Sequence, residues 1–243
     1  MSGARLEITG LGKSFRGLRA VHDVSFSVPA GAIHALIGPN GAGKTTIFNM
    51  IAGVFVPDNG TVTLDGNSIA GLRPDLVCGA GIGRTFQIVK PFKGLSVLEN
   101  VTVGALHKRT DVAEARARAA DILQRLGLHD RRHQSAESLT LPDRKRLEVA
   151  RALATEPKLL LLDEVMAGLR PTEVDVMVGF LRELSATSGL TILLIEHVMR
   201  AVMALAARVV VVSSGEKIAE GLPQEIARNQ AVLDVYLGDP EAA

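Results

Sequence analysis

The chain has 243 residues, of which 47% are hydrophobic and 3% are aromatic, and its formal net charge is +1 at pH 7. That length suits one large α/β domain or a core with a subdomain, and the hydrophobic content allows a sizeable core. The near-neutral charge argues against a general binder of nucleic acids or anionic membranes, and the few aromatics argue against a platform for stacked bases.

Neither a disulfide framework nor a membrane anchor is expected. The single cysteine, Cys78, suits a reducing cytoplasm, and we interpret it as a small buried hydrophobe. Residues 1–7 contain no apolar run, so no signal peptide is predicted. The apolar stretch 198–212 is interrupted by Arg200 and Arg208, and it falls short of the ~20 apolar residues that a span needs. If the protein works at a membrane, another chain must supply the span.

Short strand-like segments dominate the beginning of the chain. Alternating apolar and polar residues predict strands over 6–9, 24–28 and 61–64, and an Asp-Gly turn follows the last of them. A further short apolar strand is predicted over 33–37. Together these segments predict an antiparallel sheet that lies beside a separate core.

A phosphate-binding loop follows the strand 33–37. Residues 38–46 fit the pattern G-x-x-x-x-G-K-[ST], and a helix is predicted over 45–51. The glycines lack Cβ atoms, so backbone N–H groups can approach an anion, and the start of the helix favours phosphate. Lys44 would place its charge on the β- and γ-phosphates, and the Thr45 hydroxyl would ligate Mg²⁺. The predicted nucleotide-binding residues are Gly38, Pro39, Asn40, Gly41, Ala42, Gly43, Lys44, Thr45 and Thr46.

A mostly helical insertion is predicted after a short strand that ends at residues 83–87. Helices are expected over 112–126, where Gly127 ends the pattern, and over 147–153. With the second of these helices included, the predicted helical subdomain spans about 88–155.

Candidate metal and catalytic residues follow two of the predicted strands. Asp163 and Glu164 come directly after four leucines at 159–162, a run typical of the centre of a parallel sheet. Asp163 would face Mg²⁺ directly or through water, and Glu164 would orient and deprotonate the attacking water. Gln87 ends the earlier strand segment, and its carbonyl oxygen can ligate Mg²⁺ or hold a water. Each signal is weak alone and becomes strong beside the upstream phosphate loop.

The last third of the chain continues the alternation of helices and strands. A helix is expected over 172–188, followed by a strand over 191–195 that leads to His197. Open α/β sheets bind nucleotide at this edge, which favours a γ-phosphate-sensing role for His197 over that of an ordinary surface residue. After a strand over 209–212, residues 213–216 resemble a hairpin turn, and the rest is expected to form a helical tail.

The order of these motifs resembles the ATP-binding cassette of ABC transporters, and the resemblance covers nearly the whole chain. The matching residues are Lys44, Gln87, Leu139-Thr140, Asp163-Glu164 and His197. The resemblance implies that Gln87 is the Q-loop residue, Glu164 the catalytic carboxylate and His197 the switch histidine. It also implies that Phe15 stacks on adenine, with a core aromatic as the alternative, and that residues 164–169 run from Walker B into the D-loop.

The same resemblance implies the fold class and the cofactors. We expect a P-loop NTPase core, with a mostly parallel sheet flanked by helices, an antiparallel β-subdomain and a helical subdomain insertion, all within a single domain over 1–243. The implied cofactors are ATP and Mg²⁺, with Thr45, Gln87 and Asp163 as the metal-binding residues. The implied activity is ATP hydrolysis coupled to transport.

Finer details look most like the branched-chain amino-acid (Liv-type) uptake branch. The segments that suit this branch are 84–87, 98–101, 147–153, 196–197 and the ending 236–238. The related lipopolysaccharide-export ATPase shares the ending but usually differs before the Q-loop glutamine. Because Liv-type systems belong to a larger set that also imports amides, urea and aromatic acids, the transported solute stays open.

The resemblance implies a peripheral subunit at the cytoplasmic face of the cell membrane. Its partners would be transmembrane permease subunits, a second ABC ATPase subunit in a homo- or heterodimer and, indirectly, a periplasmic or extracellular solute-binding protein, with no nucleic acid. A small-molecule kinase is a rival class, but it gives no reason for Gln87, Glu164 and His197. Two rivals lie within the ABC family itself. One is a lipid- or lipopolysaccharide-export ABC ATPase, and the second is a non-transport ABC ATPase, which usually carries two cassettes or long coiled-coil insertions.

One motif departs from the family pattern. The signature loop is typically Leu-Ser-Gly-Gly-Gln, and the matching stretch here is Leu139-Thr140-Leu141-Pro142-Asp143. Thr140 keeps a hydroxyl for the partner's ATP, but both glycines are absent and Pro142 has no N–H to offer a phosphate. Asp143 adds a negative charge near that phosphate, which the basic run 144–146 could offset, and the alternative is a well-capped helix start. We expect slow ATPase activity from this chain alone and better activity beside a partner cassette.

Overall fold

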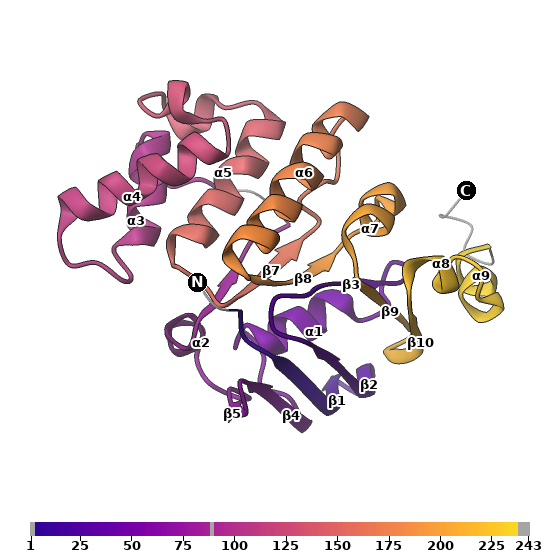
Figure 1. Cartoon of the computed structure of the whole chain (residues 1–243). Coiled ribbons are helices and arrows are strands. Elements are labelled where there is room, and N and C mark those ends of the chain that lie inside the picture. The colour runs from indigo at the N-terminus through magenta and orange to yellow at the C-terminus, as the bar shows by residue number, and fades with distance from the viewer. Residues whose placement is uncertain (1–2, 88–89, 238–243) are drawn as a thin grey trace.

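A six-stranded sheet forms the centre of the protein (Figure 1). In this computed structural model, which describes residues 3–87 and 90–237, the strand order is β10-β9-β3-β8-β7-β6. The strands are β3 (Ile33–Ile37), β6 (Ile82–Arg84), β7 (Leu159–Asp163), β8 (Thr191–Ile195), β9 (Arg208–Ser213) and β10 (Glu216–Gly221). Strand β10 runs antiparallel to β9, and the other neighbours run parallel. The predicted fold class is confirmed.

The three central strands are buried on both faces. Every residue of β3, β7 and β8 is buried. Successive side chains of a strand point to opposite faces, so Leu160 and Leu162 join one hydrophobic cluster while Leu159 and Leu161 join another. The run of four leucines is therefore explained by two cores, one on each side of the sheet.

One of these cores lies between the central sheet and the predicted antiparallel sheet. The antiparallel strands have the order β2-β1-β4-β5, with bounds β1 (Leu6–Phe15), β2 (Leu18–Val28), β4 (Asn59–Leu64) and β5 (Asn67–Ser68). Helix α1 (Lys44–Ile51) lies between the two sheets (Figure 1). Its buried Ile47 and Phe48 share a cluster with Leu6 of β1 and Leu36 of β3. This packing fixes the start of α1 against the end of β3.

Helices cover the opposite face of the central sheet. Helices α3, α4 and α5 gather at one end, and α6 and α7 cover the rest (Figure 1). Their bounds are α3 (Val97–Ala105), α4 (Val112–Arg125), α5 (Leu141–Ala154), α6 (Pro171–Ser188) and α7 (Met199–Leu205), with short 3₁₀ helices η1 (His129–Arg131) and η2 (Ala136–Ser138) before α5. Helices α3, α4 and α5 pack together through buried alanine, valine and leucine side chains. The subdomain boundary of about 88–155 stays a prediction, and residues 88–89 lie outside the described residues.

Several elements are not predicted by the sequence patterns. Helices α2 (Pro74–Ala80), α3 and α7 have only seven to nine residues each, too few for a clear apolar period. The expectation of an all-helical tail is wrong for residues 216–221, which form β10. The turn before it carries positive φ at Ser214 (49°) and Gly215 (82°), the geometry of a tight hairpin that returns the chain as a strand. The tail begins only with α8 (Pro223–Ile226) and α9 (Gln230–Leu237).

Two local expectations also change. Helix α5 begins at Leu141, before the expected 147–153 and at the helix start that was the alternative for 140–143, because its first two turns are mostly polar and show no apolar stripe. Cys78 on α2 is half-buried rather than buried. The residue Gly238 of the predicted tail motif lies outside the described residues.

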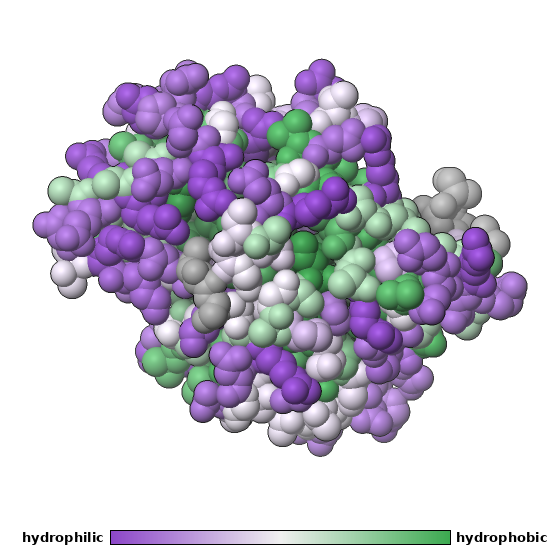
Figure 2. Space-filling model, in the orientation of Figure 1, coloured by the Kyte–Doolittle hydropathy of each residue, from purple (hydrophilic) through white to green (hydrophobic). Residues whose placement is uncertain are grey.

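No helix in the described part of the chain, residues 3–87 and 90–237, is long and apolar enough to cross a membrane. The apolar stretch 198–212 instead supplies α7 and β9, with Arg200 and Arg208 at its exposed positions. Figure 2 shows a face on which hydrophilic residues cover most of α3 and α4, while paler and apolar residues lie over the central elements.

Candidate functional site

The predicted phosphate loop leaves the end of β3 and enters α1. Helix α1 starts at Lys44, and among the described residues no side chain caps this start. Its first-turn N–H groups therefore remain available for an anion. Lys44 is 6% exposed, and its Nζ donates to the carbonyls of Gly38 (2.6 Å) and Pro39 (2.7 Å). The loop thus wraps around the ammonium group of Lys44.

Two glycines of this loop sit where no other residue fits. A Cβ atom on Gly38 would lie 2.0 Å from the carbonyl oxygen of Val212, and one on Gly43 would lie 2.5 Å from that of Ala20. Both also have positive φ, 152° and 100°, a region that side chains disfavour. The close approach to β9 and β2 therefore requires glycine at both positions.

Asp163 ends β7 beside the phosphate loop and is 1% exposed. Its Oδ2 pairs with the Arg84 guanidinium at 3.2 Å, while its Oδ1 is buried and, among the described residues, has no hydrogen-bond partner. Burial raises the pKa of Asp163, and Arg84 opposes that rise. An orphaned carboxylate oxygen of this kind is suited to a cation.

The residues predicted to ligate Mg²⁺ line one cavity. It has a volume of about 470 Å³ and is lined by Thr45, Arg84, Phe86, Gln87, Lys90, Glu148, Arg151 and Asp163. A hydroxyl, an amide carbonyl and a carboxylate are oxygen donors of the type that Mg²⁺ prefers. Thr45, Gln87 and Asp163 therefore fit a divalent cation in both chemistry and position.

The predicted catalytic residues meet at the Glu164 carboxylate. Gln87 Nε2 donates to Glu164 Oε2 at 2.8 Å, and His197 Nε2 lies 2.7 Å from Glu164 Oε1. The parallel strands β7 and β8 end at the same edge, which brings Glu164 and His197 together although 33 residues separate them. The structure thus brings all three residues into one cluster beside the cavity.

Phe15 lies away from this cluster at the end of β1. It is 38% exposed, so it is not the core aromatic of the alternative interpretation. Its ring meets Phe55 edge-to-face with centroids 5.1 Å apart, and Lys13 Nζ lies 5.7 Å from its centroid. An exposed ring face is compatible with stacking on a base, and that role stays a prediction.

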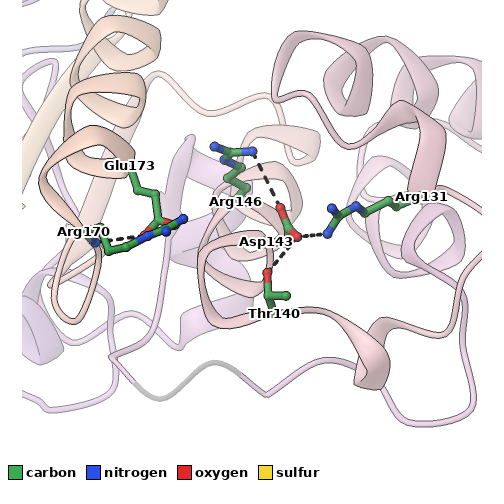
Figure 3. Close-up of polar contacts among 6 residues, drawn as sticks. All are labelled: Arg131, Thr140, Asp143, Arg146, Arg170 and Glu173. Atoms are coloured by element: carbon green, nitrogen blue, oxygen red, sulfur yellow. Dashed lines mark hydrogen bonds and ion pairs between the residues drawn. The ribbon is translucent and has the colours of Figure 1, made fainter.

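The altered signature loop forms a closed polar cluster at the start of α5 (Figure 3). Thr140 precedes the helix, but its Oγ1 donates to Asp143 Oδ2 at 2.8 Å instead of capping a backbone N–H. Asp143 is 6% exposed, and it also contacts the Arg131 guanidinium and lies 3.6 Å from Arg146 Nη1. The acid is therefore neutralised from within this chain. The nearby Arg170 is separately bound to Glu173 (Figure 3).

The expectation that the whole basic run 144–146 offsets Asp143 is wrong for two of its members. Only Arg146 reaches the acid, whereas Arg144 donates to the Glu137 carbonyl and Lys145 Nζ donates to the Glu164 carbonyl at 2.8 Å. On a helix, adjacent residues point in different directions, so a run of like charges cannot act as one group.

The sequence patterns do not predict the roles of three polar residues at the site. They are the buried Lys145 and Glu196, and Arg84, whose side chain is 10% exposed. Glu196 is 1% exposed, and its Oε1 accepts from the Met166 N–H at 2.9 Å. Burial raises the pKa of Glu196 to about 7. Arg84 and Glu196 do lie in the segments 84–87 and 196–197 that carry Gln87 and His197, but that position does not indicate what their side chains contact.

The sequence of this chain matches two protein-family models. The family model described as ABC transporter matches residues 21–167. The chain belongs to the ABC transporter family. A second model, described as a branched-chain amino acid ATP-binding cassette transporter, matches residues 216–242. The cassette is accordingly an ATPase that binds nucleotide.

Full-length relatives are similar to this cassette. It is 40% identical to the high-affinity branched-chain amino acid transport ATP-binding protein LivG of Salmonella typhimurium, over 98% of this chain and 100% of the relative. It is 38% identical to BraF of Pseudomonas aeruginosa, a protein of the same description, with the same coverage. It is also 39% identical to the lipopolysaccharide export system ATP-binding protein LptB of Escherichia coli, over 97% of this chain and 98% of the relative.

Solved cassettes share the fold. A nucleotide-free ATP-binding cassette from an ABC transporter matches with a TM-score of 0.89 and 31% identity, covering 97% of this chain and 100% of that one. The ADP conformation of MJ1267, an ATP-binding cassette of an ABC transporter, matches with a TM-score of 0.88 and 30% identity, covering 97% of this chain and 99% of that one.

Proposed function

We propose that this cassette drives an importer of branched-chain amino acids or of related amides and organic acids. The observation that carries the proposal is the 38–40% identity to LivG and BraF proteins over nearly the whole chain. The match of residues 216–242 to a branched-chain amino acid cassette model supports the same solute class. Lipopolysaccharide export is the second candidate, because LptB is 39% identical over 97% of the chain.

The nucleotide would bind with its phosphates at the start of α1. Lys44 would exchange its two carbonyl partners for phosphate oxygens. Thr45, Gln87 and Asp163 would hold Mg²⁺, which when bound would neutralise charge on the β- and γ-phosphate oxygens. Phe15 would stack on the adenine at the outer end of the site.

Glu164 would act as the general base of hydrolysis. Its carboxylate would accept a proton from the water that attacks the γ-phosphorus. Gln87 and His197 already contact its two oxygens, so they would set the direction of the carboxylate and contact the water or the γ-phosphate when these arrive. A base held from both sides loses little orientational freedom on reaction, which favours turnover.

The permease subunits would dock beside the predicted helical subdomain. An apolar groove of about 260 Å³ runs between α2 and α3 and is lined by, among others, Phe86, Phe92, Val54 and Val103. These four side chains are 41–53% exposed, and exposed apolar groups that gather in one groove mark an interaction site. Residues just after Gln87, including Pro91 and Phe92, would thus carry the membrane-subunit contact and hold the cassette peripherally at the cytoplasmic face.

Two cassettes would close on ATP. Each nucleotide would lie between one phosphate loop and the α5 start of the second cassette, so ATP binding favours the closed pair and hydrolysis reopens it. This chain offers an intact phosphate loop, but its Thr140 hydroxyl and α5 start are engaged with Asp143. We therefore propose a partner cassette that supplies the better signature loop. A solute-binding protein would deliver the solute to the permease.

Uptake measurements on a deletion strain test the solute class. Loss of the gene should abolish high-affinity uptake of labelled leucine and leave surface lipopolysaccharide unchanged. Restoration by the wild-type gene but not by a Glu164→Gln copy would tie uptake to hydrolysis. Normal leucine uptake together with lipopolysaccharide retained in the inner membrane would replace the proposal with the export alternative.

A further inference from the structure

The catalytic segment that follows β7 has a strained backbone. Glu164 has φ of 50°, in the left-handed region that residues other than glycine rarely adopt. Such a conformation persists only where the surroundings hold it, and it is often found at functional sites. The contacts that hold Glu164 therefore decide where its carboxylate points.

Two of these contacts come from the end of β8 and the residue after it. The Glu164 N–H donates to the Ile195 carbonyl at 3.0 Å, and the Met166 N–H donates to Glu196 Oε1 at 2.9 Å. Because β7 and β8 are neighbouring strands in which every residue is buried, these contacts belong to the core.

The third contact comes from the helical side of the molecule. Lys145 of α5 is 5% exposed, and its Nζ donates to the Glu164 carbonyl at 2.8 Å. The same Nζ lies 3.5 Å from the Gln87 carbonyl. One buried ammonium thus reaches the main chains of two residues whose side chains are hydrogen-bonded to each other at 2.8 Å.

Nearby carboxylates offset part of the cost of burying the Lys145 charge. Burial lowers the pKa of Lys145, while the carboxylates of Glu196, Glu164 and Asp163 oppose that change. A buried ammonium is stable only when it is paired and hydrogen-bonded. Arg146, the next residue on α5, turns instead toward Asp143 (Figure 3). Helix α5 thus contacts Glu164 through Lys145 and, through Arg146, the polar cluster of Asp143, here called the signature cluster, whose other members are Thr140 and Arg131.

We propose that Lys145 is a positioning residue that couples the placement of α5 to the orientation of the catalytic Glu164. A shift of α5 would move Nζ away from the Glu164 carbonyl and relax the strained segment, so that the carboxylate loses its direction. The apolar groove next to α3 and the signature cluster at the start of α5 could both act on hydrolysis through this contact. The inference rests on the proposed role of Glu164 as the base.

Three variants of the full chain test this coupling. Lys145→Met removes the ammonium but keeps the length of the side chain, and Lys145→Arg keeps a cation that can donate. Arg125→Met is the matched control, because Arg125 is an exposed basic residue on the neighbouring helix α4. The measurements are hydrogen–deuterium exchange of the 164–167 peptide, binding of Mg–ATPγS, and kcat and KM for ATP.

In Lys145→Met, the amide hydrogens of residues 164–167 should exchange about tenfold faster, which is the change in exchange rate expected when one hydrogen bond is lost. Its kcat should fall at least tenfold, with KM and nucleotide binding within about twofold, and Lys145→Arg should recover most of both effects. Unchanged exchange in Lys145→Met would overturn the proposal, as would an equal effect of Arg125→Met or a loss confined to nucleotide binding. The exchange result is independent of the base assignment, whose own failure would show as normal turnover in Glu164→Gln.

Discussion

Arg84 Nη2 and Asp163 Oδ2 form a buried ion pair at 3.2 Å, with side chains that are 10% and 2% exposed. The same guanidinium donates to Asn49 Oδ1 of α1 at 2.6 Å. Arg84 therefore joins β6, β7 and α1, the three segments around the predicted Mg²⁺ position. Arg84 contacts only Oδ2, and within residues 3–87 and 90–237 nothing donates a hydrogen bond to the other Asp163 oxygen, which suits a cation.

Removal of Arg84 should destabilise the nucleotide-free cassette more than the loaded one. Arg84→Met removes the ion-pair partner of the buried Asp163 carboxylate, and breaking such a pair costs about 3–5 kcal/mol. Mg²⁺ with ATP should recover part of this loss by supplying a new counter-charge. Chemical denaturation with and without Mg–ATP measures both effects. Arg73→Met is the control, because its pair with Asp75 is exposed and should matter little; an equal loss in both variants would contradict the prediction.

Glu164→Gln should separate ATP binding from turnover. The amide keeps the size of the side chain and an oxygen toward its neighbours but cannot accept the proton of water, so kcat should fall by about 10²–10⁴. Nucleotide affinity should stay within a few-fold. A phosphate-release assay and a fluorescent-nucleotide titration measure the two quantities, with Glu183→Gln on the exposed face of α6 as control. Unchanged turnover would remove the role of Glu164 as the base.

The sequence predicts a site residue when strand order alone determines its position, and it fails when the position depends on helix packing. Glu164 and His197 were predictable because parallel strands end at one edge, so residues after β7 and β8 must meet. The contact of Lys145 with the Glu164 carbonyl was not, since it depends on how α5 turns over the sheet. Within the run 144–146 no local pattern distinguishes Lys145 from Arg146, and only tertiary packing sends one to Glu164 and the other to Asp143.

Some elements of the fold were likewise predicted from the sequence and others were missed. The strand 159–162 was predicted from a continuous apolar run, which a two-sided core requires. Helix α3 was missed although Ser96 and Glu99 form a capping box at its start, a signal that the sequence does carry. The strand β10 follows from the turn at Ser214 and Gly215, because a hairpin turn needs a second strand.

Restoring the signature loop should speed hydrolysis. The double variant Pro142→Gly, Asp143→Gln restores a backbone N–H and removes the acid that engages Thr140. Purified wild-type chain should hydrolyse ATP slowly, and the variant should be at least several-fold faster at saturating ATP if two copies of this chain pair. Robust wild-type hydrolysis that neither change affects would refute a weakened signature loop. Thermal denaturation serves as the control for the freed Arg131 and Arg146.

Alanine at two loop glycines should have unequal effects. A Cβ on Gly43 would lie 2.5 Å from the Ala20 carbonyl oxygen, whereas one on Gly41 meets nothing within 4 Å. Both residues have positive φ, 100° and 75°, so the backbone strain is shared and the clash is specific to Gly43. Gly43→Ala should lose ATP binding at least tenfold more than Gly41→Ala, as measured by nucleotide titration. Equal losses would mean that the clash is relieved by a shift of β2.

The stability of the cassette should carry a pH dependence that originates at Glu196. Burial raises the pKa of this carboxyl to about 7, against 4.5 as its ordinary value. The nearby Glu164 carboxylate adds to the rise, and Lys145 and the N–H groups of Met166 and Val198 oppose it. Between pH 4.5 and 7 the folded chain therefore binds more protons at this group than the unfolded chain, so this contribution to stability falls as pH rises through that window.

Glu196→Gln isolates that contribution. The amide oxygen can still accept from the Met166 N–H, but no ionisation has to be suppressed. As pH rises from 5 to 8, the unfolding free energy of the wild type should therefore fall relative to that of the variant. By pH 8 this relative change should reach about 3 kcal/mol in favour of the variant. Denaturant titrations of both proteins at pH 5, 6, 7 and 8 give this difference, in which the other titrating groups cancel. A difference that is independent of pH would show that Glu196 is ionised throughout, held by Lys145.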